Sequence, residues 1–238
     1  GVRVEHLQEM IDKNQYGEYA GHPKLGAADY MLTHRSLATG RSVYTFCMCP
    51  GGYVVPAASE EGGVVTNGMS YNDRAGQNAN SAIVVTIYPE DYGSNHPLSG
   101  IAFQRYWEEK AYSVGGGGYT APVQLIGDFL EDRLSSNFGA VKPTYKPGVK
   151  LAQIKDCLPD YVTRALKDAI IGFDKKIKGF AQPEGILTAI ETRTSSPVRL
   201  LRGTTMESLN LKNFYPAGEG AGYAGGIVSS AVDGIKVA

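Results

Sequence analysis

The sequence of 238 residues predicts an α+β fold, in which a β-barrel-like or antiparallel domain carries a helical subdomain and the chain closes with a strand and a helix. Three observations support this prediction. Short apolar runs separated by turn residues fill the first third of the chain. Helical periodicity is strongest between residues 97 and 180. A glycine-rich turn near the C-terminus lies between an apolar stretch and an amphipathic segment.

The first third of the chain is predicted to be mainly β-structure. Residues 2–5 alternate apolar and charged side chains, as in a strand, and residues 8–13 fit a short helix or turn. Further strands are predicted at residues 41–47, 52–56, 63–66 and 81–87. Pro-Gly-Gly, Glu-Glu-Gly-Gly and Asn/Asp-rich turns separate them. Short strands at this spacing favour an antiparallel sheet or a small barrel.

The next part of the chain, residues 97–180, is predicted to be a helical excursion. Apolar side chains gather on one side of residues 98–112, and residues 159–178 show the clearest helical spacing. Between these two helices, Thr120 fits the N-cap of a helix through Leu134, because a proline follows in the first turn.

Strand character returns after the excursion, at residues 185–192 and 198–202. We therefore expect residues 1–207 to form one insert domain with the helical excursion inside it. Residues 208–238 are expected to be a separate closing segment.

The closing segment combines a strand candidate at residues 214–217, a glycine-rich turn, and a helix candidate at residues 227–237. Its glycines fit the dinucleotide fingerprint G-x-G-x-x-G at Gly220, Gly222 and Gly225. The free N–H groups of a helix N-terminus attract anions, and glycine lets the backbone touch a ligand. The fingerprint normally opens a βαβ unit of about 30 residues, whereas this chain ends before a second strand can follow. Spacing alone leaves open a tight turn that only packs the helix.

The tail FYPAGEGAGYAGGIVSSAVDGIKVA resembles the C-terminal segment of uncharacterised FAD-dependent dehydrogenases. These are related to the HI0933-like flavoproteins of the glutathione-reductase-type FAD superfamily. Other similar stretches are VRVEHLQEMID, YTFCMCPGGYVVPAASEEGGVVTNGMS, NANSAIVV and ETRTSSPVRL. The resemblance therefore covers most of the chain.

The resemblance implies a flavin-dependent oxidoreductase whose insert domain faces a small-molecule substrate. Residues 208–238 would then be the last strand and helix of a Rossmann-like FAD domain. The N-terminal half of that domain is absent from this chain and is expected to be its partner. The implied cofactor contacts are Gly218, Glu219, Gly220, Gly222, Tyr223, Gly225 and Gly226, with the Glu219 carboxylate on the ribityl chain of FAD. The isolated chain is expected to be inactive and to bind FAD weakly or not at all.

No catalytic acid or base is identified, and the catalytic candidates are Arg193, Cys47 and Cys49. Arg193, within ETRTSSP, can hold a substrate carboxylate or stabilise charge on reduced flavin, but a surface strand with a salt bridge explains it equally well. The two cysteines are either buried structural residues or thiols near the flavin. Because Cys157 is remote in sequence, no metal site is predicted.

Composition excludes other classes of function. A formal net charge of −1 argues against nucleic acid as a partner. The sequence contains no run of about 18 apolar residues, so no membrane-spanning helix is predicted. Three cysteines make no disulfide framework, so a reducing cytoplasm is expected. The alternative to a flavoenzyme is a non-enzymatic, β-rich module that binds a ligand or a partner protein.

Overall fold

The computed structural model describes all 238 residues, and the chain divides into two compact units. The first, here called the sheet unit, comprises residues 1–86 and 106–192. The second, here called the C-terminal unit, comprises residues 87–105 and 193–238. The domain boundary expected after residue 207 concerns the FAD domain of a longer protein and stays a prediction.

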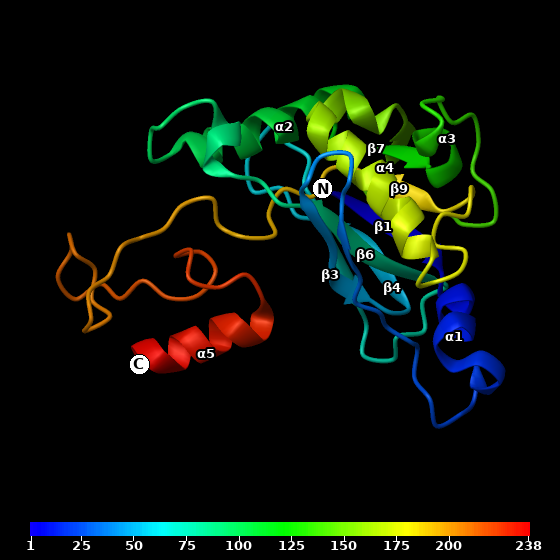
Figure 1. Cartoon of the computed structure of the whole chain (residues 1–238), viewed down its shortest axis with the longest axis horizontal. Coiled ribbons are helices and arrows are strands. Elements are labelled where there is room, and N and C mark those ends of the chain that lie inside the picture. The colour runs from blue at the N-terminus through cyan, green and yellow to red at the C-terminus, as the bar shows by residue number, and fades with distance from the viewer. The chain divides into compact units, whose positions relative to one another are not determined.

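The sheet unit is built on a seven-stranded sheet with the strand order β2-β3-β6-β1-β9-β7-β8 (Figure 1). Its strands are β1 Val2–Leu7, β2 Thr33–Arg35, β3 Ser42–Cys49, β6 Asn78–Val85, β7 Ala121–Leu125, β8 Val149–Leu151 and β9 Ile186–Thr188. Neighbouring strands run antiparallel except β7 and β8, which are parallel.

The α+β class is confirmed, and of the two expected arrangements the barrel-like closure is wrong, while all but one of the strand pairs are antiparallel. A barrel requires its first and last strands to pair, and here β2 and β8 are the two unpaired edges of an open mixed sheet. Both edge strands are only three residues long, which leaves little backbone to pair with a further strand.

The two faces of the sheet differ in chemistry because side chains alternate along the central strand β1. Val2, Val4 and His6 share one face, where the His6 ring lies 4.7 Å from the ring of Phe180. Arg3 and Glu5 share the other face, and both are fully buried. Charged side chains on a fully buried strand are unusual and must find partners in the interior.

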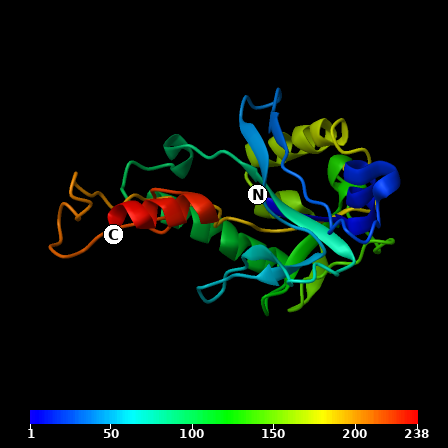
Figure 2. The ribbon, with the colours of Figure 1, turned by 90° about the horizontal axis from the view of Figure 1, so that it is seen from below.

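Helix α4 (Asp160–Asp174) covers the apolar face and a β-hairpin covers the charged one (Figure 2). Phe173 of α4 stacks edge-on against Phe180 at 5.3 Å. The hairpin consists of β4 (Gly52–Pro56) and β5 (Thr66–Ser70). Its Gly68 packs so closely on the sheet that a Cβ atom there would lie 2.8 Å from Cζ of Arg3.

The remaining helices of the sheet unit are short. They are α1 Gln8–Tyr16, η1 Gly17–Tyr19, α3 Ile126–Leu130 and η3 Ile154–Cys157. Helix α2 (Ser99–Gly115) contributes residues to both units, which divide it after Arg105. None of the helices is both long and apolar enough to cross a membrane.

The helix expected from Thr120 to Leu134 is wrong, because its first part is strand β7 and only the five residues of α3 are helical. Tertiary pairing decides the outcome. Strand β7 lies between β8 and β9, and four of its five residues are buried. The pairing energy of two neighbouring strands outweighs a local capping signal.

The C-terminal unit consists mainly of turns, with η2 (Pro89–Tyr92) and the terminal helix α5 (Ile227–Val237). Helix α5 coincides with the predicted helix. The strands expected at residues 214–217 and 198–202 are wrong, because the only pairing there is an isolated bridge between Arg202 and Ser208.

Candidate functional site

The residues from Gly218 to Gly226, here called the glycine loop, form a tight turn that leads directly into α5. The amide of Gly222 donates to the carbonyl oxygen of Glu219 at 2.9 Å, and the amide of Tyr223 donates to that of Gly218 at 3.0 Å. Gly218 and Gly222 have φ values of +69° and +80°, a region that disfavours residues with a Cβ atom. All seven predicted cofactor residues therefore lie in one ordered loop.

Segment 195–199 packs against the glycine loop along its backbone. A Cβ atom on Gly222 would lie 2.3 Å from the carbonyl oxygen of Val198 and 3.0 Å from Cα of Arg199. At Gly225 the nearest atom to such a Cβ is Cβ of Ser195, at 3.7 Å. The structure thus brings the end of the ETRTSSP motif beside the glycine loop.

A bidentate ion pair fixes the glycine loop to α5. Nη1 and Nη2 of Arg202 bind the two carboxylate oxygens of Asp233 at 2.9 and 2.6 Å. Nη1 of Arg202 also donates to the carbonyl oxygen of Pro216 at 2.7 Å, and the amide of Gly218 donates to Asp233 Oδ2 at 2.8 Å. The bonds from Arg202 and then from the Gly218 amide lower the pKa of Asp233 to about 2.

Tyr223 lies between two guanidinium groups. Cζ of Arg202 is 3.7 Å from the ring centroid and Cζ of Arg199 is 5.0 Å from it. The Tyr223 hydroxyl accepts from the amide of Arg202 at 3.2 Å and donates to the carbonyl oxygen of Leu200 at 3.1 Å. The ring is therefore held at its edge by hydrogen bonds and on its surface by cation–π contacts.

Three glycines leave the backbone of the loop open to a ligand. A Cβ atom on Gly220 would meet nothing within 4 Å, and Gly225 and Gly226 would have one ordinary contact each. Gly226 is the N-cap residue of α5, whose first-turn N–H groups lack partners within the helix. Glu219 is half-buried, and its carboxylate makes no hydrogen bond or ion pair in the structure.

These features fit FAD. Open glycine backbone and helix N–H groups suit its diphosphate, while a carboxylate acceptor suits the ribityl hydroxyls.

Of the three catalytic candidates, Arg193 lies far along the chain from Cys47 and Cys49. Arg193 is half-buried in coil and is the first residue of the second segment of the C-terminal unit, residues 193–238. Cys47 and Cys49 belong to the sheet unit, at an irregularity in the pairing of β3 with β6. Cys47 is exposed and has a φ of +43°, whereas Cys49 is buried and burial raises its pKa.

A buried ion pair beneath Cys47 was not predicted from the sequence. Nε of Arg3 lies 2.7 Å from Oε2 of Glu191, and both side chains are buried. Nη1 and Nη2 of Arg3 donate to the Cys47 carbonyl oxygen at 2.7 Å and to Asn67 Oδ1 at 2.8 Å. Burial raises the pKa of Glu191 to about 7, although the charge of Arg3 opposes the rise. The available signal was Arg3 itself, a charge within an apolar strand pattern.

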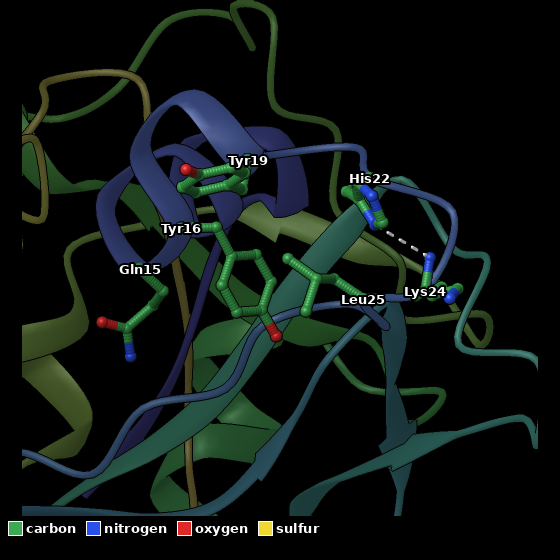
Figure 3. Close-up of a pocket in the computed structure, with 6 residues that line it drawn as sticks. All are labelled: Gln15, Tyr16, Tyr19, His22, Lys24 and Leu25. Carbon is green, nitrogen blue, oxygen red and sulfur yellow. Dashed lines mark hydrogen bonds between the residues drawn. The ribbon is translucent and has the colours of Figure 1, made fainter.

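A hollow of about 440 Å³ lies beside α1 and η1 (Figure 3). Its lining residues are Gln15, Tyr16, Tyr19, His22, Lys24 and Leu25. The amide of Lys24 donates to Nδ1 of His22 at 3.2 Å. Tyr19 is 61% exposed, so the hollow is a shallow surface feature, and it contains none of the predicted site residues.

The chain is similar to a known protein family and to a protein of a bacterium. A family model described as FAD-dependent protein, C-terminal domain-like, matches residues 1–194. An uncharacterized protein of Clostridium beijerinckii (strain ATCC 51743 / NCIMB 8052) is 60% identical over 238 residues, which are 100% of this chain and 45% of that protein. The chain therefore spans less than half the length of this relative. The glycine loop lies beyond the residues that the family model matches but within the alignment to the relative.

Proposed function

This chain belongs to the FAD-dependent protein, C-terminal domain-like family, and from that membership we propose that the protein containing it is an FAD-dependent oxidoreductase. The substrate is proposed to be a small molecule. The HI0933-like subtype and the dehydrogenase activity implied by the sequence resemblance are part of the same proposal.

The observation that carries the proposal is the open glycine loop. Gly220, Gly225 and Gly226 let a ligand approach the backbone, and the unengaged carboxylate of Glu219 stands in the same loop. A loop that served only to pack α5 would have its glycine positions filled by neighbouring atoms, as at Gly222.

In this proposal the residues of the chain bind and orient the cofactor. Glu219 accepts hydrogen bonds from ribityl hydroxyls, and the N–H groups of the first turn of α5 face the polar part of FAD. FAD, when bound, supplies the hydride and electron transfer. Arg193 and the thiols of Cys47 and Cys49 are proposed for the substrate side.

We also propose that the rest of the parent protein covers α5. Ile227, Val228, Val232 and Ile235 of this helix are 84%, 76%, 45% and 77% exposed. A helix with several apolar side chains in solvent usually packs against another element. The relative extends well beyond the 238 aligned residues, and an N-terminal FAD-binding half is the proposed partner.

The test uses the full-length protein. It is expected to purify with, or to take up, stoichiometric FAD, visible as flavin absorption and released as FAD on denaturation. Glu219→Gln should weaken FAD binding by roughly tenfold, the size of one lost charge-assisted hydrogen bond.

Glu207→Gln is the matched control, because Glu207 lies in the same unit but bonds the amide of Asn213. A colourless protein that takes up no FAD would instead favour the non-enzymatic binding module.

A further inference from the structure

Two arginines contact Tyr223, and only one of them is neutralised. Arg202 binds both carboxylate oxygens of Asp233. Arg199 makes one hydrogen bond, from Nε to the carbonyl oxygen of Gly222 at 3.0 Å, and pairs with no carboxylate. Beside the glycine loop there is therefore one guanidinium, that of Arg199, whose charge no carboxylate of the chain neutralises.

We propose that Arg199 is the anion-binding side chain of the glycine loop and that it binds a phosphate group of the dinucleotide. This proposal rests on the proposed FAD function and adds a role for Arg199 that neither the fingerprint nor the family resemblance assigns. Arg199 lies 23 residues before Gly222 along the chain, so only the fold brings it to the loop.

The contacts of Arg199 orient its guanidinium while leaving its outer edge unused. Nε donates to the carbonyl oxygen of Gly222, and Cζ lies over the Tyr223 ring. The two terminal nitrogens, with four N–H donors, make no bond within the chain, and the residue is exposed. A terminal guanidinium edge of this kind matches two oxygens of one phosphate.

A series of contacts among Asp233, Arg202 and Tyr223 positions Arg199. Asp233 fixes Arg202, and the amide and guanidinium of Arg202 fix the hydroxyl and ring of Tyr223. Tyr223 in turn supports Arg199. Because the side chain is already held in place, less conformational entropy is lost when an anion binds.

Arg199 and Glu219 together indicate the class of ligand. A guanidinium requires an anionic group, whereas a carboxylate without a cation requires hydroxyl or N–H donors. A molecule that carries both phosphate and polyol hydroxyls satisfies the two residues at once, as a nucleotide does.

The experiment measures FAD affinity of the full-length apoprotein at low and high ionic strength for Arg199→Gln and Arg199→Lys. Arg199→Gln should weaken FAD binding by about 10- to 100-fold at low salt and make the affinity less dependent on salt. Arg199→Lys should keep the salt dependence and recover part of the affinity, because it retains the charge but loses the planar fork.

The control is Arg133→Gln, which removes an exposed arginine of the sheet unit that pairs with Asp128 and Glu131. It should leave FAD affinity unchanged. Thermal unfolding of the apoprotein should shift only slightly in Arg199→Gln, because the hydrogen bond and the ring contact that it removes involve an exposed side chain.

Two results would overturn the role of Arg199. Wild-type affinity in Arg199→Gln would show that the residue does not touch the ligand. Weaker binding with an unchanged salt dependence would show that the substitution only disturbs the loop. Failure of the wild-type protein to bind FAD at all would instead refute the proposed function.

Discussion

Replacing Gly222 with alanine should loosen the glycine loop, because both the backbone and the surroundings exclude a Cβ atom there. The φ of +80° costs an alanine about 1 kcal/mol relative to glycine. The new Cβ would also lie 2.3 Å from the Val198 carbonyl oxygen, a backbone atom that can yield only if segment 195–199 shifts. Overpacking of this kind costs about 1–3 kcal/mol. The loop should therefore lose at least about 2 kcal/mol.

Hydrogen exchange of the full-length apoprotein measures this loss directly. The amide of Tyr223 bonds the Gly218 carbonyl oxygen at 3.0 Å, and the amide of Gly218 bonds Asp233 at 2.8 Å. Both amides should exchange faster by about 30-fold in Gly222→Ala, the factor that corresponds to about 2 kcal/mol.

Gly220→Ala is the matched control, because a Cβ at Gly220 meets nothing within 4 Å. Exchange at Gly218 and Tyr223 should stay at the wild-type rate in this variant. The reasoning would be refuted if Gly222→Ala also exchanged at the wild-type rate, or if the two variants behaved alike.

Three further predictions concern charged and thiol groups. The pKa of Asp233 is lowered from 3.8 to about 2, so the stability that this carboxylate gives the C-terminal unit is complete above pH 3.8 and is lost as the pH falls toward about 2. The Gly218 amide shift in an NMR titration should show that step, and Asp233→Asn should abolish it. The pKa of Glu191 is raised from 4.5 to about 7, so its contribution is complete below pH 4.5 and is lost as the pH rises through about 7. Thermal unfolding should therefore show a lower midpoint at the alkaline end of that window, and an unchanged slope in Glu191→Gln would contradict the assignment. Iodoacetamide should label Cys47 in the native protein but not Cys49 or Cys157, which are buried, and burial raises the pKa of Cys157 to about 12. Peptide mapping checks this, and native labelling of Cys157 would count against the fold.

The elements with strong periodicity could be predicted from the sequence. The alternation at Val2 to Glu5 indicated β1, and the apolar stripe after Pro159 indicated α4, because each pattern reports which face of an element is buried. The closing helix α5 followed from the same signal, although its apolar side is exposed in this chain.

Pairings between distant segments could not be predicted in this way. The local sequence of strand β7 predicts a helix, because its partners β8 and β9 come later in the chain and do not affect the local pattern. For the same reason, the sequence does not distinguish an open sheet from a barrel. Strand spacing predicts that strands pair but does not determine whether the first and last of them meet.

In the candidate site too, residues with a local sequence pattern could be predicted, whereas contacts between distant residues could not. The glycines and Glu219 could be identified from local spacing and from the family resemblance. Arg202 and Asp233 are 31 residues apart, and their ion pair depends on how α5 folds back on the preceding coil. Arg3 and Glu191 form a buried ion pair although one lies near the first residue of the sheet unit and the other near its last. A long-range ion pair of this kind has no sequence signature beyond an unexpected charge in an apolar segment.

The central claim is that the glycine loop holds the cofactor, and hydrogen exchange of the full-length protein with and without FAD tests it most directly. Peptides covering residues 218–226 should exchange more slowly when FAD is bound, because the ligand covers the open backbone at Gly220, Gly225 and Gly226. If FAD binds with protection elsewhere while residues 218–226 exchange at the same rate as in the apoprotein, the assignment of the loop is wrong.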